Sequence, residues 1–311
     1  MADALPVLYF DRELPGEYAD LVEGRAVAVG PDLADLADAQ AVIAGSVVAW
    51  NAAAFAAGPK LKVISRTGVG YDNVHVADAH AAGITVCYTP EAPTVSTAEH
   101  AVALMLAITK GLPALQQRAA AGLSGAVPTS MELDGQVLGL LGIGRIAKRV
   151  AVTGAAVGMR VIAHDPFVTT TDAPAALVSL DELLSTSHVL SLHAPATPET
   201  QHVIDAGALG RMQPGAYLVN CARGGLVDQD ALLASLDAGH LAGAGLDVTD
   251  PEPLPVGHPL LVHPRVIVTP HVASATVAGR RRLYSQGIDN ALAVLAGRPA
   301  TTVPVPSTGS L

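Results

Sequence analysis

The most informative segment of the chain reads Val137-Leu138-Gly139-Leu140-Leu141-Gly142-Ile143-Gly144-Arg145-Ile146-Ala147. An apolar run typical of a buried strand is followed at once by a G-x-G-x-x-A pattern that opens a helix. Gly142 permits the tight turn, Gly144 lets the backbone approach a pyrophosphate, and Ala147 is small enough for close packing of helix on strand. An anion would then bind at the helix N-terminus. Without further context, an ordinary glycine-rich turn explains the pattern equally well.

The following predicted strand supplies that context. It ends at His164-Asp165, which places Asp165 about 20 residues after Gly144, the distance at which an acid meets the adenosine ribose of a dinucleotide. A carboxylate there repels a 2′-phosphate, and residues 166–168 contain no basic side chain, so the pattern predicts NAD rather than NADP as cofactor. The alternative interpretation of Asp165 is a solvated turn acid before Pro166.

Short apolar runs rich in β-branched residues recur on both sides of this segment, with helical stretches between them. Such runs predict parallel strands covered on both faces, and they fall into two α/β units. The first series comprises 6–10, 26–29, 41–44, 61–65 and 84–87, and the second 137–141, 160–163, 189–192, 216–220, 242–246 and 266–268. A helix over 96–110 is expected between the series, capped by Ser96 or Thr97 with Glu99 completing a capping box. A second helix is expected over 279–295, followed by a Pro, Thr and Ser tail from 298 to 311.

Composition excludes several classes of protein. The chain has 311 residues, 50% of them hydrophobic and 15% charged, which is unlike the composition of a disordered protein. A net charge of −10 with 3% aromatic residues disfavours nucleic-acid binding, and no apolar stretch is long enough to predict a membrane helix. Two cysteines cannot form a disulfide framework, so a cytoplasmic location is the simplest interpretation. Histidine pairs five residues apart do not match zinc spacing, and no metal is expected.

Three polar loops follow predicted strands of the second series. They are Asn220 to Asp228, then Leu246 to Val248 with Pro251-Glu252-Pro253, then Thr269-Pro270-His271. In doubly wound sheets ligands bind beyond the carboxyl ends of strands, where these loops can converge. Arg223 offers a planar fork for a carboxylate, His271 can exchange a proton near neutral pH, and Glu252 can orient the imidazole. Taken singly, these residues are more often a surface cation, a buried histidine and a solvated acid.

With these residues the sequence resembles the D-isomer-specific 2-hydroxyacid dehydrogenase family. The agreement extends over nearly the whole chain, through 66–73, 96–100, the glycine loop with Asp165, the segment around Arg223, Pro251-Glu252-Pro253 and Thr269-Pro270-His271. The resemblance implies an α/β fold in which a Rossmann NAD-binding domain, 97–283, is inserted in a flavodoxin-like substrate-binding domain formed by 1–96 and 284–311. It also implies an active site in the interdomain cleft and a homodimer formed through the nucleotide domain.

The same resemblance assigns roles to individual residues. The catalytic Arg, Glu and His of the family fall on Arg223, Glu252 and His271. Substrate contacts fall on Val69, Gly70, Arg223 and, for a phosphate, Arg66. Cofactor contacts fall on Gly142, Gly144, Arg145, Ile146, Asp165, Ala194, Pro195, Cys221, Ala222 and Asp247. The implied reaction is hydride transfer between NAD(H) and a small D-2-hydroxy acid or 2-keto acid.

Other features leave the substrate and even the activity open. The segment around Arg223 looks most like phosphoglycerate dehydrogenases, so a short enzyme of that type is one alternative. A non-catalytic NAD(H)-sensing binding protein is another, since some corepressors resemble the same family. The 119–132 stretch is smaller and more polar than is usual in the family, and Glu91 would be awkward beside an anionic substrate.

Overall fold

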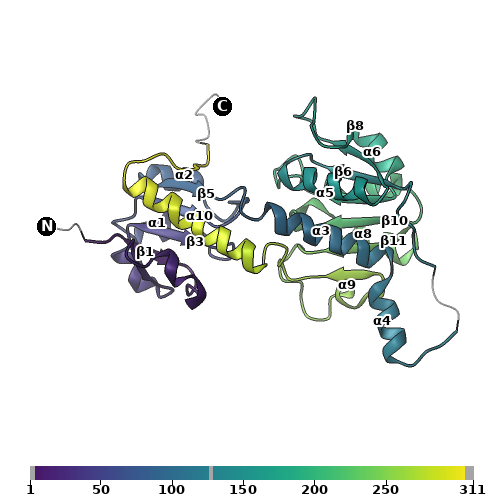
Figure 1. Cartoon of the computed structure of the whole chain (residues 1–311), viewed down its shortest axis with the longest axis horizontal. Helices are drawn as coiled ribbons and strands as arrows, with labels where there is room; N and C mark the ends of the chain where they lie inside the picture. The colour runs from purple at the N-terminus through teal and green to yellow at the C-terminus, as the bar shows by residue number, and fades with distance from the viewer. Residues whose placement is uncertain (1–3, 126–128, 305–311) are drawn as a thin grey trace. The chain divides into compact units, whose positions relative to one another are not determined.

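The chain forms two units, each built on one parallel sheet (Figure 1). The computed structural model describes residues 4–125 and 129–304. One unit comprises Met1–Pro93 with Thr276–Leu311, and the other Thr94–Ala275. The domain limits suggested by the sequence lie a few residues further along the chain and remain a prediction. Residues 305–311 of the expected tail, and 126–128 of the shortened stretch, lie outside the described residues.

The first unit carries a five-stranded sheet in the order β2-β1-β3-β4-β5. This is the 2-1-3-4-5 order of flavodoxin-like folds. Its strands are β1 (Val7–Phe10), β2 (Val27–Val29), β3 (Ala41–Ala44), β4 (Val63–Arg66) and β5 (Thr85–Tyr88). Its helices are α1 (Ala52–Ala56), α2 (Val76–Ala81) and α10 (Val277–Leu295), with 3-10 helices η1 (Gly16–Leu21) and η2 (Leu33–Ala37). Ile288 and Ala291 of α10 are fully buried against Phe10 and Ile43.

The second unit carries a seven-stranded sheet in the order β12-β11-β10-β9-β6-β7-β8. Counted from β6, the first six strands have the 3-2-1-4-5-6 order of a Rossmann fold. The strands are β6 (Val137–Leu141), β7 (Arg160–His164), β8 (Ala176–Leu177), β9 (Val189–Leu192), β10 (Ala216–Asn220), β11 (Leu241–Leu246) and β12 (Val266–Val268). The helices are α3 (Thr94–Thr109), α4 (Leu112–Ala120), α5 (Arg145–Ala156), α6 (Leu180–Thr186), α7 (Ala206–Arg211), α8 (Gln229–Asp237) and α9 (Pro259–Val262), with the 3-10 helix η3 (Gly224–Leu226).

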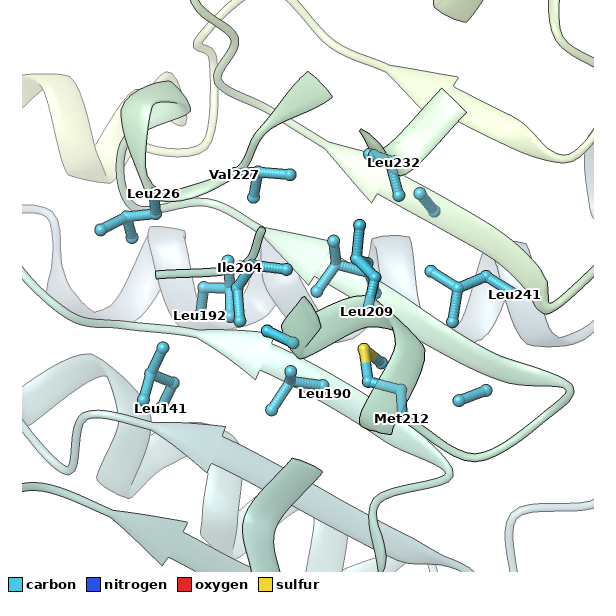
Figure 2. Packing of buried hydrophobic residues seen from close by; sticks show 14 of the residues in the cluster. Leu141, Leu190, Leu192, Ile204, Leu209, Met212, Leu226, Val227, Leu232 and Leu241 are labelled. Atoms are coloured by element: carbon cyan, nitrogen blue, oxygen red, sulfur yellow. The ribbon is translucent and has the colours of Figure 1, made fainter. Parts of the chain in front are cut away.

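Both faces of this sheet are covered by helices. On one face, leucines of β6 and β9 pack with Leu209 of α7 and Leu232 of α8, as Figure 2 shows. On the other face, α3 and α5 bury Leu104, Met105 and Val150 against the same strands. The apolar runs are therefore continuous because every side chain of these strands meets a helix layer. The predicted fold class, a parallel α/β fold in which a Rossmann domain is inserted in a flavodoxin-like domain, is confirmed.

Local boundaries differ from the sequence prediction in informative ways. The expected strands are present, with ends moved by up to two residues. The capping box is wrong: α3 begins at Thr94, so Ser96 and Thr97 lie inside the helix and are buried. Strand β8 is not predicted from the sequence, because a two-residue edge strand is too short to give an apolar run. Within the described residues, no helix is long and apolar enough to cross a membrane.

Candidate active site

The glycine loop joins β6 to α5 in the second unit. Gly142 has φ +91°, and a Cβ on it would lie 2.9 Å from the backbone of His193, so only glycine fits. Gly144 caps α5, and the space beyond its Cα holds no heavy atom within 4 Å of where a Cβ would stand. Ala147 is fully buried. The loop therefore pairs a close packing contact on one side with open space at a helix N-terminus, an arrangement suited to an anionic group.

Asp165 stands beside this loop, directly after β7. Its Oδ2 accepts the amide of Ile143 at 3.1 Å, and its Oδ1 accepts the amide of Phe167 at 3.0 Å. Each oxygen keeps acceptor capacity for a further donor such as a ribose hydroxyl. Of the two residues expected to present amides to the pyrophosphate, Arg145 is exposed and Ile146 is half-buried.

Ala194 and Pro195 follow β9 on the other side of the glycine loop. Ala194 is half-buried and Pro195 is exposed. The preceding residue, His193, donates its amide to Leu141 O at 2.7 Å and lies 2.9 Å from Ser191 Oγ through Nε2. Burial lowers the pKa of His193 to about 4, so the ring is neutral at physiological pH. The sequence analysis did not single out this residue.

Arg223 belongs to a short loop after β10. Asn220, the last residue of that strand, is 1% exposed, and its side chain bonds to the backbone of Ala222 and Arg223. The Arg223 backbone is extended, and its Nη1 donates to Ala222 O at 2.7 Å. A Cβ on Gly224 would lie 2.0 Å from Thr249 O, so the loop packs tightly on the segment that leads to Glu252.

Both cysteines are free thiols. Burial, reinforced by the charge of Asp247, raises the pKa of Cys221, and burial raises that of Cys87 to about 11. Neither thiol is ionised at neutral pH, which argues against a nucleophilic role.

Glu252 and His271 meet at the end of the neighbouring strands. His271 Nδ1 lies 2.6 Å from Glu252 Oε1, with 36% of the imidazole and 40% of the carboxylate side chain exposed. Partial burial by itself raises the pKa of Glu252, but the hydrogen bond with His271, its charge and that of Arg223 outweigh burial and hold the pKa below its usual value. Glu252 therefore stays ionised and fixes one ring nitrogen of His271.

The backbone of His271 adopts a left-handed conformation, with φ +52°. Its amide donates to Asp247 O at 2.8 Å and to Thr269 O at 3.0 Å, which holds this uncommon conformation in place. The orientation of the imidazole is therefore set by the conformation of this loop, since His271 lies in neither a helix nor a strand.

The Asp247 side chain is buried and bonded within the unit. Its Oδ1 accepts Thr269 Oγ1 at 2.6 Å and Val272 N at 2.9 Å, and its Oδ2 accepts Ala273 N at 2.8 Å. His100 on α3 lies 3.4 Å from the same Oδ1 and 3.0 Å from Thr269 Oγ1. Both oxygens thus hold the segment that carries His271, a role that the sequence analysis missed, whereas the expected contact with nicotinamide remains a proposal.

The residues expected to bind substrate in the first unit lie at the carboxyl end of β4. Arg66 is 7% exposed, and its Nε donates to Asn73 Oδ1 at 3.3 Å. Val69 is 40% exposed and Gly70 is half-buried in the loop that follows. Glu91 is exposed beyond β5.

Sequence reasoning assembled the glycine loop, Asp165, Arg223, Glu252 and His271, and the structure places these at the carboxyl ends of the strands of one sheet. It missed Asn220, whose signal was a polar residue ending an otherwise apolar strand. Among the described residues, no group of three or more His, Cys, Asp and Glu side chains is arranged to hold a metal ion.

Comparisons with known proteins agree with this geometry. Residues 102–273 match the NAD binding domain of the D-isomer specific 2-hydroxyacid dehydrogenases. A D-3-phosphoglycerate dehydrogenase of Mycobacterium tuberculosis is 39% identical over 311 aligned residues, which cover 94% of this chain and 58% of the relative. The chain therefore spans little more than half the length of that relative. A glyoxylate reductase of Thermofilum pendens is 38% identical over 250 residues, covering 78% of this chain and 74% of the relative.

Solved structures resemble the fold over almost the entire chain. A crystal structure of a Thermus thermophilus protein superposes with a TM-score of 0.86 and 38% identity, covering 95% of this chain and 99% of the other. The sequence resemblance is thus confirmed over both units: the chain belongs to the D-isomer-specific 2-hydroxyacid dehydrogenase family, and its Thr94–Ala275 unit is the NAD-binding domain.

Proposed function

We propose that this protein is an NAD-dependent oxidoreductase that interconverts a small D-2-hydroxy acid and its 2-keto acid. The observation that carries the proposal is the 2.6 Å contact between His271 Nδ1 and Glu252 Oε1, in the same unit as a glycine loop with Asp165 beside it. A proton-exchanging imidazole and a dinucleotide loop on one sheet are the two parts that such a reaction requires.

The chemistry assigns one task to each of three side chains. The bound cofactor supplies or accepts the hydride at C2 of the substrate. In reduction, protonated His271 gives a proton from Nε2 to the carbonyl oxygen, since Nδ1 is engaged by Glu252; in oxidation the neutral ring takes that proton back. Glu252 fixes the tautomer of the ring through its contact with Nδ1. Arg223 binds the substrate carboxylate through its planar guanidinium.

Substrate contacts are proposed on the other unit as well. Arg66 and the backbone of Val69 and Gly70 are at the carboxyl end of a parallel strand, where ligands of such sheets bind. The identity with phosphoglycerate dehydrogenases favours a phosphorylated substrate as the second candidate, with Arg66 near the phosphate. The unphosphorylated 2-keto acid remains the primary proposal.

The residues around the glycine loop fit a dinucleotide. Gly142 and Gly144 shape the turn, and the amides of Arg145 and Ile146 at the start of α5 would hold the pyrophosphate. Asp165 would accept hydrogen bonds from the ribose hydroxyls and would repel a 2′-phosphate, so we propose NAD in preference to NADP. Ala194 and Pro195 would flank the adenosine, and Cys221, Ala222 and Asp247 would contact the nicotinamide.

We also propose a cytoplasmic homodimer formed through the Thr94–Ala275 unit. Helix α4 of this unit buries none of its residues. Leu112, its first residue, is 52% exposed, and Leu123, just beyond its end, is 59% exposed. A second copy would cover such apolar surface. Light scattering of the purified chain measures its mass directly.

The experiment that tests the activity measures NADH and NADPH oxidation with glyoxylate, hydroxypyruvate, pyruvate, longer 2-keto acids and phosphohydroxypyruvate. We expect turnover with NADH, and a loss of about 10²- to 10⁴-fold in kcat for His271→Ala. His75→Ala, which removes an exposed imidazole in the other unit, is the matched control and should retain activity. Tight NADH binding with no turnover on any acid would reject the enzyme and favour an NAD(H)-sensing protein.

A further inference from the structure

Asn220 is a buried polar residue that the proposed reaction does not use. It ends β10, whose other residues are Ala216, Tyr217, Leu218 and Val219, and it is 1% exposed. A buried amide is retained only where its donors and acceptor find partners, because leaving them unpaired costs about 1–3 kcal/mol each. The partners of Asn220 therefore indicate what the residue does.

Both ends of the Asn220 amide bond to the loop that carries Arg223. Oδ1 accepts the amide of Ala222 at 3.0 Å, and Nδ2 donates to Arg223 O at 2.8 Å. One side chain thus fixes the backbone on either side of residue 222. The backbone oxygen of Asn220 also accepts Asp247 N at 2.8 Å, which ties the start of the loop to the adjacent strand end.

The side chain of Arg223 also bonds within this loop. Its guanidinium donates through Nη1 to Ala222 O, so this contact ties the side chain to the backbone that Asn220 holds. On the far side, Gly224 packs against Thr249 O so closely that a Cβ would stand 2.0 Å from it. The loop therefore packs against the Thr249 backbone and is hydrogen-bonded to the Asn220 side-chain amide.

We propose that Asn220 is a positioning residue for Arg223: its side-chain amide holds loop 221–223 in the conformation in which the guanidinium binds the substrate carboxylate. The inference rests on the proposed function for what Arg223 binds. The size of the expected effect follows from geometry, since a misplacement of a binding group by about 1 Å lowers the rate by up to about 10²-fold.

A purely structural role is the competing account, and the chain contains a matched control for it. Asn290 on α10 bridges backbone in the same way, with Nδ2 donating to Tyr88 O at 3.0 Å and Oδ1 accepting Thr301 N at 3.0 Å. It does so in the other unit. Asn220→Ala and Asn290→Ala remove equivalent hydrogen bonds, so they separate lost stability from lost positioning.

The first measurement compares steady-state kinetics of the full-length variants. We expect Asn220→Ala to raise the KM for the 2-keto acid at least tenfold with a smaller change in kcat, because the carboxylate contact exists before and during hydride transfer. Asn290→Ala should change KM less than twofold. Asn220→Asp keeps an acceptor for Ala222 but places a carboxylate oxygen against Arg223 O, so it should resemble Asn220→Ala.

A double-mutant cycle tests whether the effect passes through Arg223. In an Arg223→Ala background, Asn220→Ala should lower kcat/KM less than twofold further, because the group it positions is gone. The same loss in both backgrounds, or an unchanged KM for Asn220→Ala in the Arg223 enzyme, would overturn the inference.

Hydrogen exchange of the Ala222 amide gives a readout that does not depend on turnover. Asn220→Ala should accelerate this exchange at least tenfold, and Asn290→Ala should leave it unchanged. No acceleration would overturn the positioning role whatever the enzyme does. A wild-type protein that turns over no acid would instead reject the proposed function, while the exchange result would still decide whether Asn220 holds the loop.

Discussion

Replacing Asp247 by Asn probes how the His271 loop is held. The amide is nearly isosteric with the carboxylate, but it has one acceptor oxygen in place of two. The better orientation leaves that oxygen in the Oδ1 position, where it still accepts Thr269 Oγ1 and Val272 N. The amide nitrogen then faces Ala273 N, a donor against a donor at a distance of 2.8 Å.

The expected cost can be worked out bond by bond. Leaving the buried Ala273 amide unpaired costs about 1–3 kcal/mol, and two bonds that lose their charged acceptor weaken by about 1 kcal/mol each. The neutral amide is easier to bury than a carboxylate, which offsets part of this loss. We therefore expect Asp247→Asn to lower the free energy of unfolding of the Thr94–Ala275 unit by about 3 kcal/mol.

Urea unfolding followed by two signals measures this change. Circular dichroism reports both units, whereas fluorescence of Trp50, the single tryptophan, reports the first unit alone. Asp228→Asn is the matched control, because Asp228 accepts one amide as the cap of α8 and Asn caps helices equally well. A loss below about 1 kcal/mol in the circular dichroism transition, or an equal loss in the control, would refute this account of Asp247.

Two further predictions concern the cofactor side of the unit. Gly142→Ala should abolish NADH binding measured by calorimetry, because a Cβ at φ +91° meets the His193 backbone at 2.9 Å and forces the loop to move; wild-type affinity would contradict this. His193 has its pKa lowered to about 4, so the unfolded chain takes up a proton below pH 6.5 that the folded chain takes up only near pH 4. Stability conferred by the neutral ring is therefore lost as pH falls through this window, by about 2 kcal/mol between pH 7.5 and pH 5. His193→Gln should flatten the pH dependence of urea unfolding by that amount, and an unchanged slope would reject it.

The glycine loop and Asp165 were predictable because their signals are local. A strand, a turn and a helix start follow one another in the sequence, and the acid lies on the next strand of a parallel unit. Arg223, Glu252 and His271 were found as polar residues in loops after predicted strands, and the family resemblance assigned them catalytic roles. The hydrogen-bond partners of a buried polar residue are not local in sequence. An apolar strand pattern therefore does not show what a polar side chain at the end of the strand will contact.

Asn220 and Asp247 illustrate this limit. The sequence places both at the ends of predicted strands, but their partners depend on which strands are neighbours and in what register. Asn220 pairs with Leu246 across β10 and β11, so Asp247 lies beside the end of the Arg223 strand. The resemblance assigned Asp247 to the cofactor, and only the folded chain shows that both its oxygens accept hydrogen bonds from the segment between Thr269 and Ala273. The capping box failed because α3 begins at Thr94, which places Ser96 and Thr97 inside the helix and buries them.

The position of α10 in the chain has a consequence for the order of synthesis. This helix supplies Ile288 and Ala291 to the core of the first unit, yet it is synthesised only after the whole of Thr94–Ala275. Until α10 has been synthesised, Phe10 and Ile43 of the five-stranded sheet lack their α10 partners. The inserted unit, in contrast, is one continuous segment that contains all of its own core residues. The first unit therefore cannot complete its core until synthesis has passed α10.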